Sequence, residues 1–119
     1  MSKRNIVHVE IPAANVAAAG EFYQELFGWK MDSMPEMNYT MWEAGDGSGG
    51  GFPEVSAVNP AGQVLVYVAS DDIEEDLEKA TELGGKVLYE KTEIPGMGWF
   101  GIFQDPTGNA IGLYTSIRP

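Results

Sequence analysis

Apolar and polar residues follow one order along the chain twice. The first stretch opens with the β-branched run 5–11, which predicts a strand ending at Pro12. Asn15 can cap a following helix, and Gly28 stands where that helix would end. The helix has apolar residues at i, i+3, i+4 and i+7, and we expect this stripe, with Phe22 and Leu26 in it, to face a sheet. The stripe consists of Ala19, Phe22, Tyr23 and Leu26.

Three short strand patterns follow this helix. They cover residues 29–34, 38–44 and 49–56, and turn residues divide them at Pro35 and along 45–49. The segment 45–50 also fits a G-x-G-x-x-G pattern, but Phe52-Pro53 follow where a phosphate-binding helix would begin. We therefore interpret it as a hairpin turn. The first stretch predicts the order βαβββ.

The second stretch repeats this order from residue 64. Residues 64–69 predict a strand, and Asp71 with Glu74 forms a predicted capping pair for a second helix. The acidic run 71–76 lies at the start of that helix, where negative charge is favoured, and we expect it to be a solvated face. The apolar stripe of this helix is Ile73, Leu77, Ala80 and Gly84.

The last thirty residues predict three strands. Asp105-Pro-Thr-Gly108 has the composition of a type I turn and would join two of them. Beyond the turn, strand parity places Ala110, Gly112 and Tyr114 on one face. Gly112 would then be a gap in a wall that leaves room for a ligand.

The chain is therefore predicted to be two copies of one unit, 5–56 and 63–116, within a single domain 1–119. A half of this size buries little surface alone, so we expect the halves to pair, with their strands curled into a trough and the helices outside. The fold class is α+β. The trough is the candidate binding site.

Composition and net charge limit which classes of partner the chain is expected to bind. Seven basic and eighteen acidic side chains give a net charge of −11, which disfavours nucleic acid and anionic membrane surfaces. The chain has no cysteine, and no apolar run approaches the length of a membrane span. We expect a cytoplasmic protein that acts on a small molecule.

His8 and Glu10 share one face of the first strand and are the candidate catalytic residues. Each also has a plain structural interpretation, His8 as a hydrogen-bonded wall residue and Glu10 as a solvated carboxylate.

Aromatic residues are expected to line the trough and to suit a flat or apolar ligand, although half of them could be core. Parity places Tyr67 and Tyr114 on the face of His8 if the two copies are equivalent, and it gives Trp99 and Phe103 a common face. The predicted ligand-binding residues are His8, Tyr67, Trp99, Phe103, Gly112 and Tyr114.

These motifs resemble the vicinal oxygen chelate superfamily, which includes glyoxalase I, bleomycin-resistance proteins and extradiol dioxygenases. The resemblance rests on 7–12 (VHVEIP), 22–29 (FYQELFGW), 84–87 (GGKV), 94–99 (IPGMGW) and 105–113 (DPTGNAIGL). It implies a cupped mixed sheet of paired βαβββ modules, which in the enzymes holds a divalent metal.

The resemblance also implies where metal ligands would lie, on the first and last strand of each module. His8 matches one such place, whereas Tyr67, Gly112 and Gly50 or Gly51 occupy the other three. Three of the four ligands are missing, and a stable zinc or iron site needs at least three protein donors. We therefore expect no metal and no cofactor.

Two functions remain open. The first is a metal-free protein of the bleomycin-resistance type, expected to be a homodimer, that binds a small apolar or aromatic molecule. The alternative is a metal-dependent lyase, isomerase or dioxygenase with a degraded metal site. Metal-free acid–base chemistry at His8, as in an isomerase or epimerase, is a third interpretation.

Overall fold

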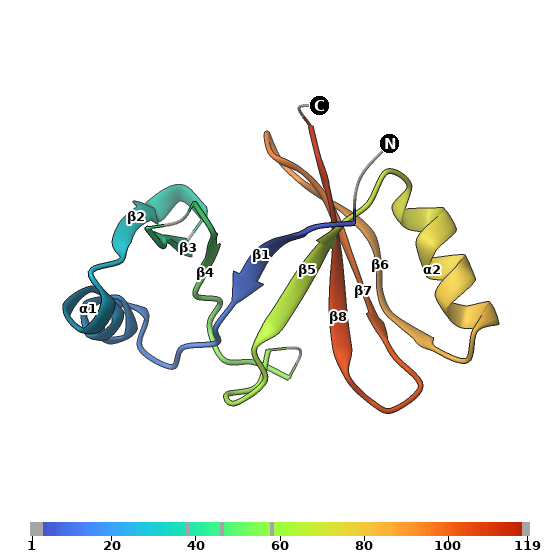
Figure 1. Cartoon of the computed structure of the whole chain (residues 1–119), viewed down its shortest axis with the longest axis horizontal. Helices are drawn as coiled ribbons and strands as arrows, with labels where there is room; N and C mark the ends of the chain where they lie inside the picture. Colours follow the sequence, from blue (N-terminus) through green and yellow to red (C-terminus); the bar gives the residue numbers. More distant parts are fainter. Residues whose placement is uncertain (1–3, 38, 46, 58, 118–119) are drawn as a thin grey trace. The chain divides into compact units, whose positions relative to one another are not determined.

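The computed structural model describes residues 4–37, 39–45, 47–57 and 59–117. Its elements run β1-α1-β2-η1-β3-β4 and then β5-α2-β6-β7-β8, where η1 is a short 3-10 helix, Pro35–Met37 (Figure 1). The chain forms two compact units, Val7–Leu65 and Val66–Pro119 together with Met1–Ile6. We call them the β1–β4 unit and the β5–β8 unit. Asn38 and Asp46, which the sequence places in a strand and a turn, lie outside the described residues.

The β1–β4 unit is a four-stranded mixed sheet in the order β2-β3-β4-β1. Strand β4 is parallel to β1, whereas β2–β3 and β3–β4 are antiparallel. The elements are β1 (Ile6–Glu10), α1 (Val16–Phe27), β2 (Lys30–Met34), β3 (Tyr39–Glu43) and β4 (Gly49–Gly51).

The β5–β8 unit repeats this topology, with the strand order β5-β8-β7-β6. Strand β8 is parallel to β5, and β7 is antiparallel to both β8 and β6. The elements are β5 (Leu65–Ala69), α2 (Ile73–Glu82), β6 (Lys86–Ile94), β7 (Gly98–Gln104) and β8 (Ala110–Ser116). The predicted α+β class, with mixed strands and two helices, is confirmed.

Local signals explain where the helices begin and end. The Asn15 side chain accepts a hydrogen bond from the Ala18 amide, and Gly28 ends α1 in the left-handed conformation with φ 76°. For α2 the cap is Asp72, whose carboxylate accepts from the Glu75 amide. The predicted Asp71–Glu74 pair was therefore placed one residue too early.

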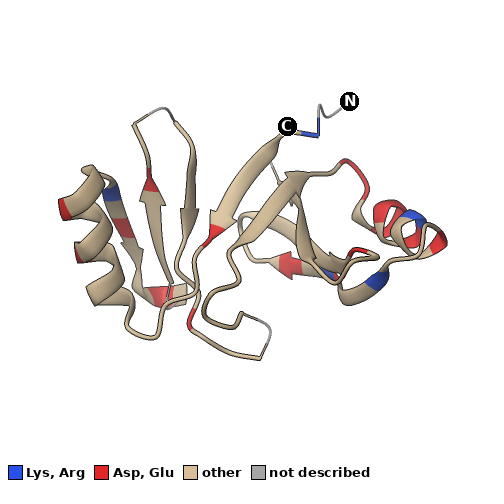
Figure 2. Ribbon diagram, turned by 60° about the horizontal axis from the view of Figure 1, so that its bottom comes forward, with Lys and Arg blue, Asp and Glu red and all other residues tan. Residues whose placement is uncertain are grey.

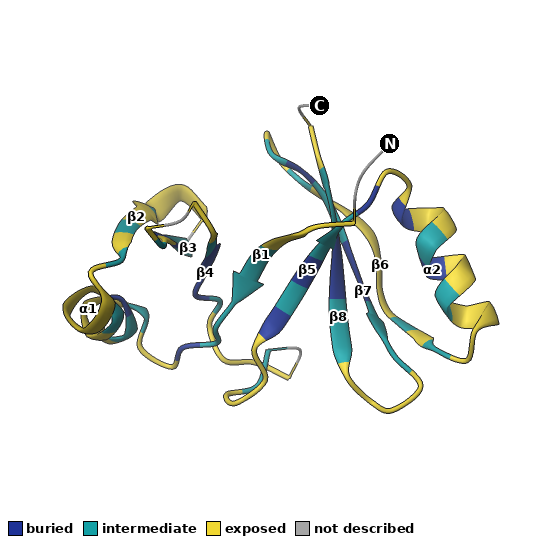
Figure 3. Ribbon diagram, in the orientation of Figure 1, coloured by how far each residue is buried: buried dark blue, intermediate teal, exposed yellow. Residues whose placement is uncertain are grey.

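Helix α1 buries only part of the predicted stripe, namely Ala19 and Tyr23. Gly20 is buried, and Val16, Ala19 and Tyr23 pack toward the core. Phe22 and Leu26 are each 59% exposed, so the prediction that they face the sheet is wrong. Much of α1 is exposed (Figure 3). The buried Gly20 faces β2, where a Cβ added to it would make ordinary van der Waals contact with the Met31 sulfur at 3.6 Å.

Each unit has its own core. In the β1–β4 unit, Ala13, Trp42 and Phe52 are buried, and Trp29 stacks on Trp42 with ring centroids 4.1 Å apart and planes 10° from parallel. In the β5–β8 unit the core comprises Ile73, Leu77 and Leu113. Burying side chains of this size is the main source of stability for each unit. Among the described residues, no helix has the length and apolarity needed to cross a membrane.

Candidate functional site

His8, Tyr39 and Glu10 form a hydrogen-bonded cluster in the β1–β4 unit. The Tyr39 hydroxyl lies 2.8 Å from His8 Nε2 and 2.8 Å from Glu10 Oε2, while these last two atoms are 3.7 Å apart. The side chains of His8 and Glu10 are 23% and 14% exposed. The cluster is thus largely shielded from solvent but still open to it.

Glycine on β4 explains how a β3 side chain reaches β1. Gly51 lies between the two strands, paired with Glu10 on β1 and with Met41 on β3. A Cβ on Gly51 would coincide with the phenol group of Tyr39. The phenol therefore occupies the volume that any other residue at 51 would fill.

The three side chains fix the positions of their protons. An ionised Glu10 can only accept, so the phenol proton of Tyr39 points to Glu10 Oε2. The Tyr39 oxygen then accepts from His8, which must carry its proton on Nε2. In the neutral ring the other nitrogen, Nδ1, is consequently an acceptor, and whatever contacts it there must donate.

A second tyrosine covers a second glycine in the β5–β8 unit. Tyr67 on β5 pairs with Gly112 on β8, and a Cβ on Gly112 would lie 2.5 Å from the Tyr67 ring. Tyr67 is 7% exposed. The predicted gap beside Gly112 is thus filled by the Tyr67 ring, and the expected room for a ligand at that point is absent.

The other predicted ligand-binding residues divide between two faces of their sheet. Trp99 and Phe103 pack against the core of Ile73, Leu77 and Leu113, on the side that α2 covers. Their common face is confirmed, and it is the core face. Tyr114 is partly buried and its hydroxyl donates to the Met97 carbonyl oxygen at 2.9 Å, which ties β8 to the turn before β7.

His8 and Glu10 belong to the β1–β4 unit, whereas Tyr67, Gly112 and Tyr114 belong to the other. That these residues line one trough stays a prediction.

The residues present do not fit a divalent metal. Of the four places that the superfamily resemblance implies, His8 alone offers a metal donor of the usual kind, and its Nε2 is engaged with Tyr39. The glycines at 51 and 112 offer no side chain, and both are covered by tyrosine. Within the described ranges, no three His, Asp or Glu side chains group to hold a metal ion.

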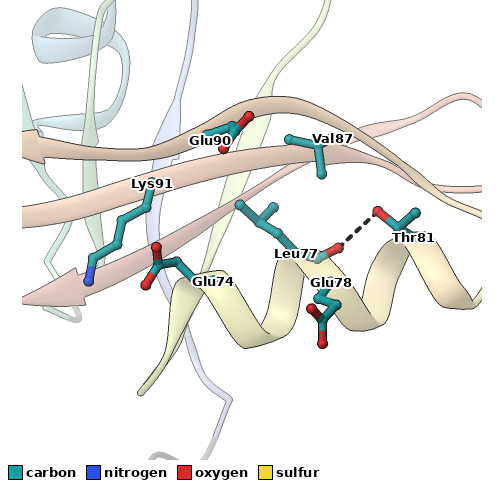
Figure 4. A pocket seen from close by; sticks show the side chains of 7 residues that line it. All are labelled: Glu74, Leu77, Glu78, Thr81, Val87, Glu90 and Lys91. Atoms are coloured by element: carbon teal, nitrogen blue, oxygen red, sulfur yellow. Dashed lines mark hydrogen bonds between the residues drawn. The ribbon is translucent and has the colours of Figure 1, made fainter.

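An open groove of about 310 Å³ lies elsewhere, between α2 and β6 (Figure 4). Leu77 and Val87 line it together with three carboxylates and one ammonium group. Its lining comprises Glu74, Leu77, Glu78 and Thr81 of α2 with Val87, Glu90 and Lys91 of β6. None of the predicted site residues lines this groove, so it supports no part of the predicted site.

The acidic start of α2 is more than a solvated face (Figure 2). Asp76 accepts two hydrogen bonds from the Arg4 guanidinium, at 2.7 and 2.9 Å, and one from the Ser70 hydroxyl at 2.6 Å. The hydrogen bonds from Arg4 lower the pKa of Asp76, although its partial burial acts in the opposite direction. This carboxylate fastens the segment before β1 to α2.

The Asp105 turn is confirmed as a hydrogen-bonded unit. The Gly108 amide donates to the Asp105 carbonyl oxygen at 3.0 Å, and the Asp105 carboxylate accepts from the backbone and side chains of Asn109 and Thr107. These hydrogen bonds, that of the Asn109 amide first, lower the pKa of Asp105 to about 2.

Sequence reasoning missed the role of Tyr39, which is not among the predicted ligand-binding or catalytic residues. The signal that could have found it is the pairing of a tyrosine on β3 with a run of three glycines on β4, residues 49–51. Side-chain-free positions on a central strand allow a ring from a neighbouring strand to cross them.

Comparisons with known proteins agree with this architecture. Residues 5–45 match a family model described as bleomycin resistance protein-like N-terminal. A putative glyoxylase, CFP32, from Mycobacterium bovis is 32% identical over 101 residues, which cover 82% of this chain. The chain spans 38% of the length of that relative.

A glyoxylase-like domain-containing protein from Didymella fabae is 30% identical over 118 residues, which cover 90% of each chain. Among solved structures, a glyoxalase/bleomycin resistance protein/dioxygenase superfamily member from Vibrio splendidus superposes with a TM-score of 0.69. That match covers 96% of this chain and all of the other, at 14% identity, and it concerns the fold alone.

Proposed function

The chain belongs to the glyoxalase/bleomycin-resistance/dioxygenase superfamily, and from this premise we propose that it is a metal-free protein that binds a small aromatic or apolar molecule. The residues at the four implied metal-ligand positions distinguish a metal-free binding protein from a metal-dependent enzyme. The residues at these points support binding without metal.

One observation carries this proposal. A tyrosine covers the glycine at a ligand place in each unit, Tyr39 over Gly51 and Tyr67 over Gly112. A glycine alone would leave room for water or for a ligand from another residue, but a ring in contact leaves little room for either. A metal site at these places would require both tyrosines to move.

The partners that we propose follow from charge and shape. A net charge of −11 repels phosphate backbones and anionic lipids, so nucleic acid and membranes are disfavoured. We further propose a homodimer, because α1 exposes Phe22, Leu26 and Phe27, apolar side chains that association would cover. The cytoplasmic location that we propose is supported by the lack of cysteine, which is compatible with a reducing compartment.

Elemental analysis of protein purified without added metal tests the proposal. We expect well under one equivalent of zinc, iron, manganese or nickel. The matched variant is His8→Ala, which removes the one metal donor of the usual kind among the four places. Stoichiometric metal in the wild-type chain that is lost in His8→Ala would overturn the proposal and favour a metal-dependent enzyme.

The His8–Tyr39–Glu10 cluster favours a second candidate, a metal-free acid–base enzyme of the isomerase or epimerase kind. An imidazole and a carboxylate joined through a phenol can pass a proton between them. Turnover that persists in the presence of a metal chelator and is lost in Glu10→Gln would distinguish this function from binding alone.

A further inference from the structure

The cluster in the β1–β4 unit already holds a phenol, the side chain of Tyr39. Its hydroxyl donates to Glu10 and accepts from His8, each at 2.8 Å, so both hydrogen-bonding directions of a phenol are matched. Its ring crosses Gly51, where the missing side chain provides the space. A position that binds one phenol in this way has the polarity and the shape to bind another.

We propose that Tyr39 is the internal occupant of a phenol-binding site, and that ligands of this chain are hydroxyaromatic molecules whose hydroxyl takes the place of the Tyr39 hydroxyl between His8 and Glu10. This inference rests on the proposed function, because it names the class of small molecule that the metal-free protein binds.

The chemistry of the two neighbours sets the selectivity. Glu10 Oε2 requires a hydrogen-bond donor, and His8 Nε2–H requires an acceptor. These two atoms, Glu10 Oε2 and His8 Nε2, are 3.7 Å apart. A hydroxyl on an aromatic ring supplies both from one atom, whereas an unsubstituted ring leaves both groups unmatched. Hydrogen bonds to a charged group contribute about 1.5–3 kcal/mol, which corresponds to about tenfold or more in affinity.

A ligand that displaces Tyr39 must replace its hydrogen bonds to His8 and Glu10 and its contact with Gly51. Tyr39 is the first residue of β3, paired with Met34 at the end of β2, so its movement affects one end of that strand and not its middle. The tethered ring has a high effective concentration at its own site, on the order of millimolar or above. A free phenol should therefore bind weakly to the wild-type chain and more tightly when Tyr39 is removed.

The test uses p-cresol, which is the tyrosine side chain without its backbone, and toluene, which lacks the hydroxyl. Each is titrated by calorimetry or by NMR into the wild-type chain, Tyr39→Ala, Tyr39→Val and the control Tyr89→Ala. Tyr39→Val retains β propensity if the alanine variant folds poorly. Tyr89 is a 38% exposed tyrosine of β6 in the other unit. Melting temperature monitors folding.

We expect p-cresol to bind the Tyr39 variants at least about tenfold more tightly than it binds the wild-type chain. In the same variants, p-cresol should bind at least about tenfold more tightly than toluene. Tyr89→Ala should resemble the wild type. Equal affinity for p-cresol and toluene in a folded Tyr39 variant, or the same gain in Tyr89→Ala, would overturn the inference. If either of these results is obtained with a chain that contains no metal, the phenol-binding site is wrong but the proposed metal-free function is not, since metal content is measured separately.

Discussion

Two glycines let tyrosine rings lie against the backbone of a neighbouring strand. Gly51 accepts the Tyr39 phenol and Gly112 accepts the Tyr67 ring, and in each case a single methyl group would overlap the ring. Each tyrosine ring therefore occupies the space that the glycine leaves by having no side chain, and any larger residue at the glycine position would displace the ring. Because this dependence is mutual, either member of a pair can be tested through the other.

Gly112→Ala should destabilise the fold by about 1–3 kcal/mol, because its Cβ would lie 2.5 Å from the Tyr67 ring and must displace it. Gly45→Ala is the matched control, since nothing lies within 4 Å of a Cβ there. Denaturant melts of both variants measure the effect, and equal stability would show that the Tyr67 ring moves freely.

Asp105→Asn should lower the melting temperature near neutral pH, with the difference shrinking in acid. The folded pKa of Asp105 is lowered to about 2 from 3.8, so the carboxylate stabilises the fold above the unfolded value, and this contribution is lost as the pH falls through about 2. Melts between about pH 6 and 2 measure it. Asp32→Asn, on an exposed strand position, is the control; a pH-independent difference for Asp105→Asn would contradict the assignment.

The two helices differ in how well sequence predicts the buried face. Helix α2 has few apolar residues, and Ile73 and Leu77 are buried as predicted. Helix α1 has apolar residues around most of its circumference, so an i, i+3, i+4 pattern can be drawn on more than one face. Packing of Val16, Ala19 and Tyr23 on the core of this unit selects the face, and periodicity alone does not.

Leu26→Ala and Leu77→Ala form a matched pair of helix variants. Leu77 is 5% exposed, so its truncation should cost about 2–5 kcal/mol. Leu26 is 59% exposed, and its truncation should stay within about 0.5 kcal/mol. Denaturant midpoints of the two variants check this; a comparable loss for Leu26→Ala would show that its side chain is covered in solution, as by a second copy of the chain.

At the scale of the chain, sequence predicts the fold better than the site. Both βαβββ units and their caps follow from local signals, with errors of a residue or two at most element ends. The exception is the strand predicted over 49–56, because β4 already ends at Gly51. The His8–Tyr39–Glu10 cluster requires the register of β1, β3 and β4 together, and single-strand parity cannot supply it. Parity correctly paired Trp99 with Phe103 but could not tell which face α2 would cover.

The net charge of −11 predicts how stability responds to salt. Eighteen acidic side chains against seven basic ones repel one another more in the compact chain than in the unfolded one. Raising sodium chloride from about 10 to 200 mM shortens the screening length several-fold and should raise the melting temperature. Salt also weakens the Arg4–Asp76 ion pair, which would lower the melting temperature. Because the Arg4 side chain is largely exposed, this loss of stability is small. A lower melting temperature in salt would contradict this.

The parallel stack of Trp29 and Trp42 makes the β1–β4 unit optically distinct. Two indoles whose centroids are 4.1 Å apart and whose planes are 10° from parallel couple their electronic transitions, which adds an exciton contribution to the circular dichroism that a lone indole lacks. The third tryptophan, Trp99, is in the β5–β8 unit, with the Lys91 ammonium 5.3 Å from its ring. The coupled signal in the wild-type chain and the fluorescence of Trp99 in a chain with both Trp29→Phe and Trp42→Phe would thus report on the two units separately, and their melting curves would reveal whether the two copies unfold together.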